Sequence, residues 1–267
     1  MDFERLKIAV IGAGNMGSAL LHGWIKSKLI SPQNISISDV SKEKLENLKA
    51  FEPSINTHLS NKDAIKTADV VILAVKPWLM ETIAEEIKNE INYKEQILVS
   101  IAAGINFEKL LKIFDKKAML FRVVPNTAAE VSESLCAISS CNADSEQQQL
   151  IMKLFNCIGK TFLVPENQLN AFMSLTSCGI AYAFRYIRAA MEGGVEIGIS
   201  PEICQQAVVQ TLKGAVALLE SNQNHPEIEI DKVTTPGGIT IKGLNEMEAN
   251  GFSNAVIQGI KASWLKD

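Results

Sequence analysis

The sequence has few of the features that mark exported, metal-binding or nucleic-acid-binding proteins. Its five cysteines include no Cys-x-x-Cys pair, and none of the three histidines stands at the spacing of a metal ligand, so neither a disulfide framework nor a metal site is predicted. The 26 basic residues form no long block and are outnumbered by 30 acidic ones, which disfavours a nucleic-acid partner. We expect a cytoplasmic protein that binds neither metal nor nucleic acid.

The chain also lacks a run of about 20 mainly apolar residues, the length that crosses a membrane. Its longest charge-free stretch, Asn167 to Phe184, carries Asn, Gln, Ser, Thr and Gly throughout, so we expect a helix buried in protein and no membrane partner. Glycine and proline are scarce, at 16 and 8 residues, and 47% of the chain is hydrophobic. This composition excludes collagenous and disordered classes and is typical of a packed globular protein.

The length of 267 residues favours two domains, because a domain has about 150 residues. Residues 1–165 alternate strand-like and helix-like runs, which predicts a mostly parallel, doubly wound sheet of the Rossmann type with helices on both faces. The predicted strands are Lys7–Ile11, Ile35–Asp39, Val70–Val75, Gln96–Ile101, Met119–Val124 and Leu135–Ser140, and the predicted helices are Asn15–Ser27, Lys42–Ala50, Leu79–Asn89, Phe107–Phe114 and Asp144–Cys157.

Beyond Pro165 the strand signal disappears, and residues 166–267 are predicted to form an all-helical domain. Ser200-Pro201 is a strong helix start, with Ser as the cap and Pro at the first helical position. A polar stretch, Ser221 to Lys232, is expected to be a loop that leads into Thr234-Thr235-Pro236-Gly237-Gly238. The predicted helices are Asn167–Gly198, Pro201 to about Glu220, Ile239–Asn250 and Phe252–Leu265.

The first strand–helix junction reads Gly12-Ala13-Gly14-Asn15-Met16-Gly17, a G-x-G-x-x-G pattern. Gly12 allows a tight turn, Gly14 leaves room for a pyrophosphate at the helix N-terminus, and Gly17 lets the helix and strand pack closely. A glycine-rich turn without a ligand is the alternative. Because the pattern follows a strand and opens a helix, we predict that residues 12–17 bind a dinucleotide.

Asp39 ends the second predicted strand, about 20 positions after Gly17, where a carboxylate accepts hydrogen bonds from the adenosine ribose and repels a 2′-phosphate. This position favours NADH over NADPH. Against it, Lys42 and Lys44 follow at once and could hold a 2′-phosphate if the loop turned. The prediction is NADPH or NADH, with NADH slightly favoured.

Further motifs follow the glycine loop: Ala74-Val75-Lys76-Pro77, Ser100-Ile101-Ala102-Ala103-Gly104, Arg122-Val123-Val124-Pro125-Asn126-Thr127, Gly179-x-Ala181-Tyr182, His225-Pro226, and Val233-Thr234-Thr235-Pro236-Gly237-Gly238-Ile239-Thr240. In this number and order they resemble the motifs of the pyrroline-5-carboxylate reductases, and the resemblance covers nearly the whole chain. It implies an NAD(P)H-dependent enzyme that reduces the C=N bond of 1-pyrroline-5-carboxylate to L-proline, the last step of proline biosynthesis.

Three of these motifs fall at the carboxyl ends of predicted parallel strands, where ligands bind in doubly wound sheets. We expect them to line the nicotinamide side through Ala74, Val75, Lys76, Pro77, Ala103, Gly104, Pro125 and Asn126. Lys76 could be a catalytic lysine, but a turn-shaping Lys-Pro step is favoured. Asn126 could bind the cofactor or substrate, or satisfy the backbone of its own turn.

The backbone N–H groups of Gly237, Gly238, Ile239 and Thr240 open a helix and suit a substrate carboxylate; Thr235 is included in this predicted set. The resemblance implies that the Thr240 hydroxyl serves the ring nitrogen of the imine and is the catalytic group. The alternative is a Pro-Gly-Gly lead-in to a helix, with Thr240 capping that helix.

The resemblance also implies a homodimer, or a larger assembly of dimers, in which the helical domain of one subunit completes the active site of the other. The predicted helix Asn167–Gly198, apolar on more than one face, fits such an interface, or burial within its own domain.

The chain departs from the family pattern where Ser177, Cys178 and Ile180 replace Gly, Ser and Pro, and where Val40 replaces an Arg after the second strand. Two other readings therefore stay open. One is another two-domain hydroxyacid or imino-acid dehydrogenase, which would be expected to carry a catalytic lysine in the long helix after Pro165. No lysine occurs between Lys160 and Lys213, which disfavours this alternative. The other is a non-catalytic dinucleotide-binding homologue.

Overall fold

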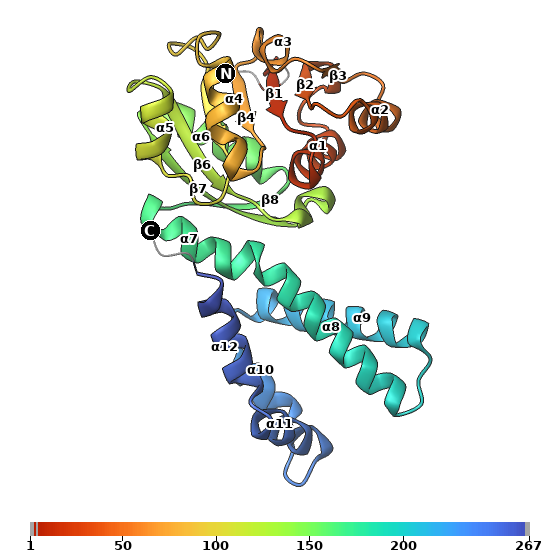
Figure 1. The fold of residues 1–267 in the computed structure, drawn as a ribbon. Helices are drawn as coiled ribbons and strands as arrows, with labels where there is room; N and C mark the ends of the chain where they lie inside the picture. The colour runs from red at the N-terminus through yellow and green to blue at the C-terminus, as the bar shows by residue number, and fades with distance from the viewer. Residues whose placement is uncertain (1–2, 4, 265–267) are drawn as a thin grey trace. The chain divides into compact units, whose positions relative to one another are not determined.

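The computed structural model describes residues 3 and 5–264 (Figure 1). The described residues up to Ser177, with Trp264, form one compact unit, and Cys178–Ser263 form a second. The boundary predicted after residue 165 stays a prediction, since a compact unit and a functional domain need not divide the chain at the same residue.

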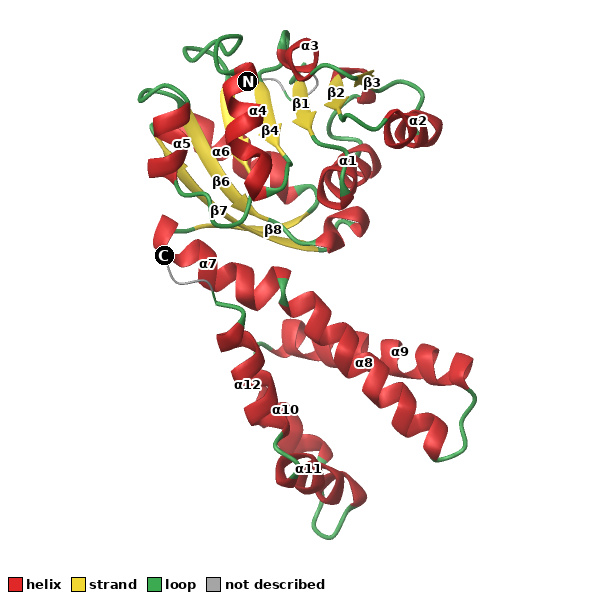
Figure 2. Cartoon of the chain, in the orientation of Figure 1, coloured by secondary structure: helices red, strands yellow, loops and turns green. Residues whose placement is uncertain are grey.

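The first unit is built on a sheet whose eight strands, among the described residues, run in the order β3-β2-β1-β4-β5-β6-β7-β8 (Figure 2). Neighbouring strands are parallel except β6 and β7, which are antiparallel. The predicted Rossmann-type, mostly parallel sheet is therefore confirmed. The strands are β1 Ile8–Ile11, β2 Ile35–Ser38, β3 Asn56–His58, β4 Val70–Leu73, β5 Ile97–Ser100, β6 Met119–Val124, β7 Ser134–Cys141 and β8 Gly159–Leu163.

Helices cover both faces of the sheet and create two cores. On one face, α1 (Asn15–Ser27), α2 (Lys42–Phe51) and α6 (Ser145–Asn156) pack on alternate strand residues such as Val10 and Val99. On the other face, α3 (Asn61–Ile65), α4 (Met80–Ile87) and α5 (Phe107–Ile113) pack on the intervening residues. The central strands are apolar on both faces because each side chain, up or down, meets a helix.

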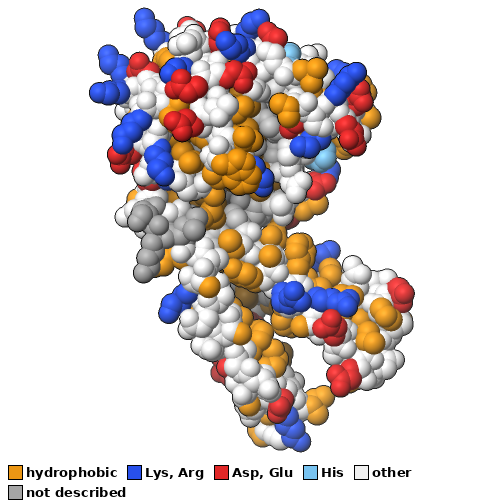
Figure 3. Space-filling model, viewed as in Figure 1, with side chains coloured by type: hydrophobic (Ala, Val, Ile, Leu, Met, Phe, Trp, Pro, Cys, Tyr) orange, Lys and Arg blue, Asp and Glu red, His pale blue; other side chains and the backbone are white. Residues whose placement is uncertain are grey.

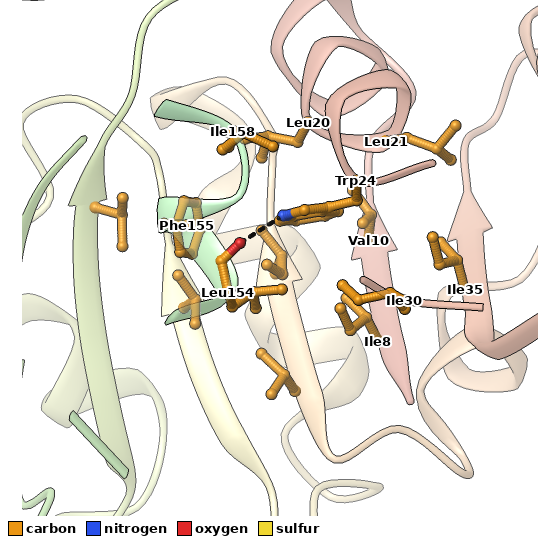
Figure 4. Close-up of a cluster of buried hydrophobic side chains, with 14 of the residues drawn as sticks. Ile8, Val10, Leu20, Leu21, Trp24, Ile30, Ile35, Leu154, Phe155 and Ile158 are labelled. Atoms are coloured by element: carbon orange, nitrogen blue, oxygen red, sulfur yellow. Dashed lines mark hydrogen bonds between the residues drawn. The ribbon is translucent and has the colours of Figure 1, made fainter. Parts of the chain in front are cut away.

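The centre of the first core is Trp24 of α1, which is fully buried (Figure 4). Its ring contacts Phe155 of α6 edge to face, with ring centroids 5.8 Å apart. Its indole Nε1–H donates to the carbonyl oxygen of Leu154 at 2.9 Å. This bond gives a second donor to a carbonyl in the last turn of α6, which also accepts from the Cys157 thiol at 3.0 Å.

Two edge strands and one helix were absent from the predicted pattern. β3 reads Asn-Thr-His and β8 is partly exposed along its length, so neither carries the apolar run that identifies a buried strand. The five-residue helix α3 is too short for a periodic pattern. Pairing with β2 and β7, a tertiary contact, selects these strands.

The segment predicted as one helix over Asn167–Gly198 is divided. It contains most of a 3-10 turn, η4 (Glu166–Gln168), then α7 (Leu169–Phe172), the π-helical turn η5 (Met173–Ser177) and α8 (Gly179–Glu196). The prediction of a loop over Ser221 to Lys232 was also wrong in part, because Pro226–Val233 form α10. His225 caps that helix and Pro226 opens it, a start signal that the polar composition obscured.

The second unit is helical, as predicted. Besides α8 and α10 it contains α9 (Pro201–Asn222), which packs beside α8, and α11 (Ile239–Ala249) and α12 (Phe252–Ala262). Leu265, the predicted end of the last helix, lies outside the described residues. No helix in the described part of the chain has the length and apolar character to cross a membrane.

The helical unit has almost no core of its own. Among its described residues, Cys204 is the one that is buried. Large apolar side chains are instead exposed over this unit, and Figure 3 shows many of them on one face. They include Phe184, Ile197, Ile203, Ile239 and Ile257. The prediction that Asn167–Phe184 is buried in protein is thus not met for α8 within a single chain.

Trp24→Phe tests the importance of the indole at the centre of the first core. We expect the free energy of unfolding to fall by about 2 kcal/mol, because the smaller ring leaves space and removes a donor from the Leu154 carbonyl. Urea denaturation measures the change. Trp78→Phe is the matched control, since Trp78 is 75% exposed and should change stability by less than about 0.5 kcal/mol. Equal losses in the two variants would contradict the assignment.

Candidate active site

The loop between β1 and α1 brings backbone unusually close to backbone. Gly12 has a φ of +107°, and a Cβ placed on it would lie 2.6 Å from the Ala74 carbonyl oxygen. A Cβ on Gly17 would collide with the carbonyl oxygen of Gly12. At Gly14 the surroundings are open, with no heavy atom within 4 Å of such a Cβ. The surroundings of the three glycines are therefore those predicted: Gly12 forms a tight turn, Gly14 leaves open space, and Gly17 allows a close packing contact.

Asp39 follows β2 and holds this loop in place. One carboxylate oxygen, Oδ2, accepts a hydrogen bond from the Ala13 N–H at 2.8 Å. The other, Oδ1, accepts from the Ser41 N–H at 2.9 Å, and Lys44 Nζ lies 3.7 Å from Oδ2. Sequence reasoning expected only a ribose contact for Asp39; the structure adds a positioning role for the glycine loop.

A cavity of about 620 Å³ opens at the carboxyl ends of the strands, next to this loop. Its size falls within the range of small-molecule and cofactor sites. Among the predicted cofactor residues, it is lined by Gly12, Gly14, Asn15, Met16, Asp39, Ala74, Val75, Lys76, Pro77 and Ala103. The cavity thus brings together segments that follow five different strands, as ligand sites in doubly wound sheets do.

The other predicted cofactor residues lie beside or beneath this cavity. Ala13 lines a neighbouring cavity of about 460 Å³ that shares Gly14 with the large one. Gly104 and Pro125 line a smaller pocket of about 190 Å³, which shares Met16 and Ala103 with the large cavity. Gly17 is buried under the loop.

Asn126 is buried and is engaged in its own turn. Its side-chain oxygen accepts from the Ala128 N–H at 3.0 Å, and its backbone N–H donates to Ser134 Oγ at 3.0 Å. Of the two roles left open for Asn126, the structure shows the one that shapes the turn.

Lys76 caps a short 3-10 turn, η2 (Pro77–Leu79), through its carbonyl, which accepts from the Leu79 N–H at 2.9 Å. Its ammonium nitrogen lies 6.0 Å from the centroid of the Trp78 ring. Both contacts are those of a residue that shapes the end of a strand, the role favoured from sequence.

Sequence reasoning missed several lining residues. In the large cavity these are Leu79, Ile101, Ala102 and Thr127, and in the small pocket Ser100, Arg122, Asn170 and Met173. Val40 and Ser177, which the sequence marks as departures from the family pattern, line the large cavity and the small pocket respectively. Half of the missed residues are apolar, a type that carries no chemical signal. Ile101, Ala102, Arg122 and Thr127 stand inside motifs already identified, so their neighbours in sequence were the available clue.

An ion pair between buried Arg122 and the partly exposed Glu166 lies at the wall of the small pocket. Arg122 of β6 donates from Nη1 to Glu166 Oε1 at 2.8 Å, and the same oxygen accepts from the Phe107 N–H at 2.6 Å. The carboxylate therefore ties the start of α5 to β6, at the favourable N-terminal end of the helix.

The predicted substrate loop lies in the helical unit, between α10 and α11. Gly237 has a φ of +71°, and the Gly238 N–H donates to the Thr235 carbonyl oxygen at 2.9 Å, which closes a turn. Gly238 then caps α11, with Ile239 and Thr240 in the first helical turn. Thr235, Gly237, Ile239 and Thr240 are exposed within the chain.

These features fit a dinucleotide. The first turn of α1 leaves N–H groups without helical partners, and Gly14 presents no side chain between them and the cavity. The charge of Asp39 is held at the far end of β2 by two N–H donors. The residues present therefore suit a pyrophosphate flanked by a ribose.

Gly14→Ala separates cofactor binding from stability. Since the backbone of Gly14 has φ −76° and ψ −176°, alanine is tolerated, and we expect stability within about 0.5 kcal/mol of the parent. The added methyl group stands in the cavity, so the Kd for NADH, measured by fluorescence titration, should rise at least about tenfold. Gly214→Ala, at an open position in α9, is the control and should leave Kd unchanged. An unaltered Kd in Gly14→Ala would argue against a pyrophosphate at this loop.

Comparison with known proteins gives two family matches and many relatives. Residues 166–267 match the family "pyrroline-5-carboxylate reductase dimerisation", and residues 7–104 match "NADP oxidoreductase coenzyme F420-dependent". Pyrroline-5-carboxylate reductase 1 of Dictyostelium discoideum is 36% identical over 96% of this chain, which spans 48% of that relative. Pyrroline-5-carboxylate reductase of Methanosarcina acetivorans is 35% identical, with 97% of each chain covered.

The solved structures agree with the sequence comparison. The crystal structure of Plasmodium falciparum pyrroline carboxylate reductase with NADP bound superposes with a TM-score of 0.90 at 28% identity, covering 98% of this chain and 96% of that one. The predicted family resemblance is confirmed over the full length of the chain. The chain belongs to the pyrroline-5-carboxylate reductase family.

Proposed function

We propose that this chain reduces the C=N bond of 1-pyrroline-5-carboxylate with a nicotinamide cofactor to form L-proline, as an NAD(P)-dependent oxidoreductase acting on an imine. The observation that carries the proposal is the cavity at the strand ends, lined by segments that follow β1, β2, β4, β5 and β6, in a chain of this family. The cofactor is a nicotinamide dinucleotide, and a bound cofactor supplies the hydride.

The reaction asks little of the side chains. A cyclic imine protonated on nitrogen is already electrophilic at carbon, so hydride addition depends chiefly on positioning. Hydride adds to the carbon, and the electron pair of the C=N π bond moves onto nitrogen. The nitrogen keeps its proton as the amine N–H. The residues of this chain hold the two partners and steady that N–H group.

The substrate loop supplies the groups for this task. The N–H groups of Gly237, Ile239 and Thr240 at the start of α11 bind the substrate carboxylate, helped by the helix dipole. Gly238 and Thr235 shape the turn through their own hydrogen bond. The Thr240 hydroxyl, one residue into the helix, contacts the ring nitrogen and is the proposed catalytic group.

A homodimer accounts for the exposed apolar surface of the helical unit. This unit matches the family's dimerisation domain and has one buried residue among those described. A second subunit would remove side chains such as Phe184 and Ile203 from water, at about 25 cal/mol per Å². We propose that the helical unit of one subunit completes the active site of the other. Assemblies of several dimers and a cytoplasmic location stay predictions.

The cofactor preference rests on Asp39 and Lys44. The Asp39 carboxylate favours a free ribose, and exposed Val40 offers no charge to a 2′-phosphate. Lys44 lies close enough to Asp39 to offset part of its charge. We propose a modest preference for NADH, with NADPH also accepted.

Thr240→Ala tests the proposed catalytic hydroxyl. We expect kcat to fall by about 10²-fold, as for the loss of a positioned proton-handling group, while the Kd for NADH stays unchanged. Oxidation of NADH with pyrroline-5-carboxylate measures the rate. Thr211→Ala, whose hydroxyl bonds within α9, is the control and should keep full activity. Unaltered turnover in Thr240→Ala would refute the catalytic role, and no turnover by the parent enzyme with either cofactor would favour a non-catalytic homologue.

Steady-state kinetics with both reduced cofactors test the preference. The parent should show a higher kcat/KM with NADH, and Lys44→Ala should widen the ratio by about 3- to 10-fold, because a surface charge pair contributes about 1 kcal/mol or slightly more. Lys42→Ala, on the exposed face of α2, is the control. A much lower KM for NADPH than for NADH in the parent would overturn the NADH preference.

A further inference from the structure

The small pocket beside the cofactor cavity is lined by Met16 of α1 and by three further segments. These are the end of β5 with its following loop, the end of β6 with Pro125, and the α7–η5 region with Ser177. All three belong to the first compact unit. The pocket shares Met16, Ala102 and Ala103 with the cofactor cavity, so its shape affects whatever part of the cofactor reaches this end.

The third segment is held by a π-helical turn, Met173–Ser177. Such turns are rare and occur frequently at functional sites, because the wider turn redirects the side chains that follow. Two hydroxyls of the turn bond back into their own helix: Ser174 Oγ donates to the Asn170 carbonyl at 3.1 Å and Thr176 Oγ1 to the Phe172 carbonyl at 2.8 Å. Each bond stays within the segment.

Ser177 differs from these two residues. Its Oγ–H donates across the pocket wall to the carbonyl oxygen of Pro125 at 2.6 Å. A second, longer contact joins the same two segments in the opposite direction, since Asn126 Nδ2 donates to the Thr176 carbonyl at 3.5 Å. Pro125 and Ser177 both line the pocket, so the hydrogen bond joins two of its three walls.

We propose that Ser177 is a positioning residue that sets the width of the pocket at the nicotinamide end of the cofactor; this inference rests on the proposed function. The hydroxyl holds the Pro125–Asn126 turn against the π-helical turn. The other side of the turn is already fixed, because Asn126 is bonded to Ser134 and Ala128. Serine here replaces the glycine of the family pattern, which has no side chain to make this bond.

The test compares two ligands that differ in the nicotinamide ring. NADH carries the nicotinamide, and ADP-ribose lacks it but keeps the adenosine, pyrophosphate and second ribose. In Ser177→Ala we expect the Kd for NADH to rise about 3- to 10-fold, the effect of one hydrogen bond. The Kd for ADP-ribose should stay within about twofold. Ser177→Gly, which also removes the hydroxyl, should behave in the same way.

Ser174→Ala is the matched control, because it removes a buried hydroxyl from the same turn whose bond stays within its own segment. Both Kd values should be unchanged in this variant. The inference is overturned if Ser177→Ala weakens NADH and ADP-ribose equally, if it weakens neither, or if Ser174→Ala matches its effect on NADH. Failure of the proposed function gives a different result, since the parent protein would then fail to oxidise NADH or NADPH with pyrroline-5-carboxylate, whatever the Kd values of the variants.

Discussion

The close backbone contact between Gly12 and Gly17 is the constraint on which the first unit depends. It brings the start of α1 against the end of β1, where a side chain at either glycine would collide. That contact directs α1 along the sheet, so that Trp24 reaches Leu154 and Phe155 of α6. The two helices lie about 130 residues apart in the sequence and share one core. It also aims the first turn of α1 at the strand ends. The same contact thus serves packing and ligand binding.

The two units differ in how far they remove their apolar side chains from water within one chain. The first has cores on both faces of its sheet, so its cavity walls are held by packed helices and by the Arg122–Glu166 ion pair. The second exposes most of its apolar side chains within one chain. The consequence is a rigid candidate cofactor site on the first unit and a predicted substrate loop on a second unit whose surface is suited to dimerisation. The helical unit matches the family's dimerisation domain, which fits its exposed apolar surface.

Sequence reasoning succeeded where the pattern was local. The helix Asn15–Ser27 and the strand Met119–Val124 have the predicted bounds, because glycine, apolar periodicity and β-branched residues mark them directly. It failed at β3 and β8, whose polar or exposed residues become strands only by pairing. It also missed the π-helical turn, because the segment is apolar on more than one face, so a shift of the helical phase at one turn leaves no visible break in the pattern. Asn126 could be assigned to its turn only after its partners were seen.

The sequence by itself determined the fold class, the glycine loop, the family motifs and the order of a sheet domain followed by helices. These depend on residue type and spacing along the chain, which the local rules of helices, strands and turns convert into structure. The tertiary structure alone decided that Asp39 holds the loop through Ala13, that Glu166 joins β6 to α5, and that Ser177 reaches Pro125. Each of these bonds joins residues distant in sequence, so its existence depends on how the packed elements meet.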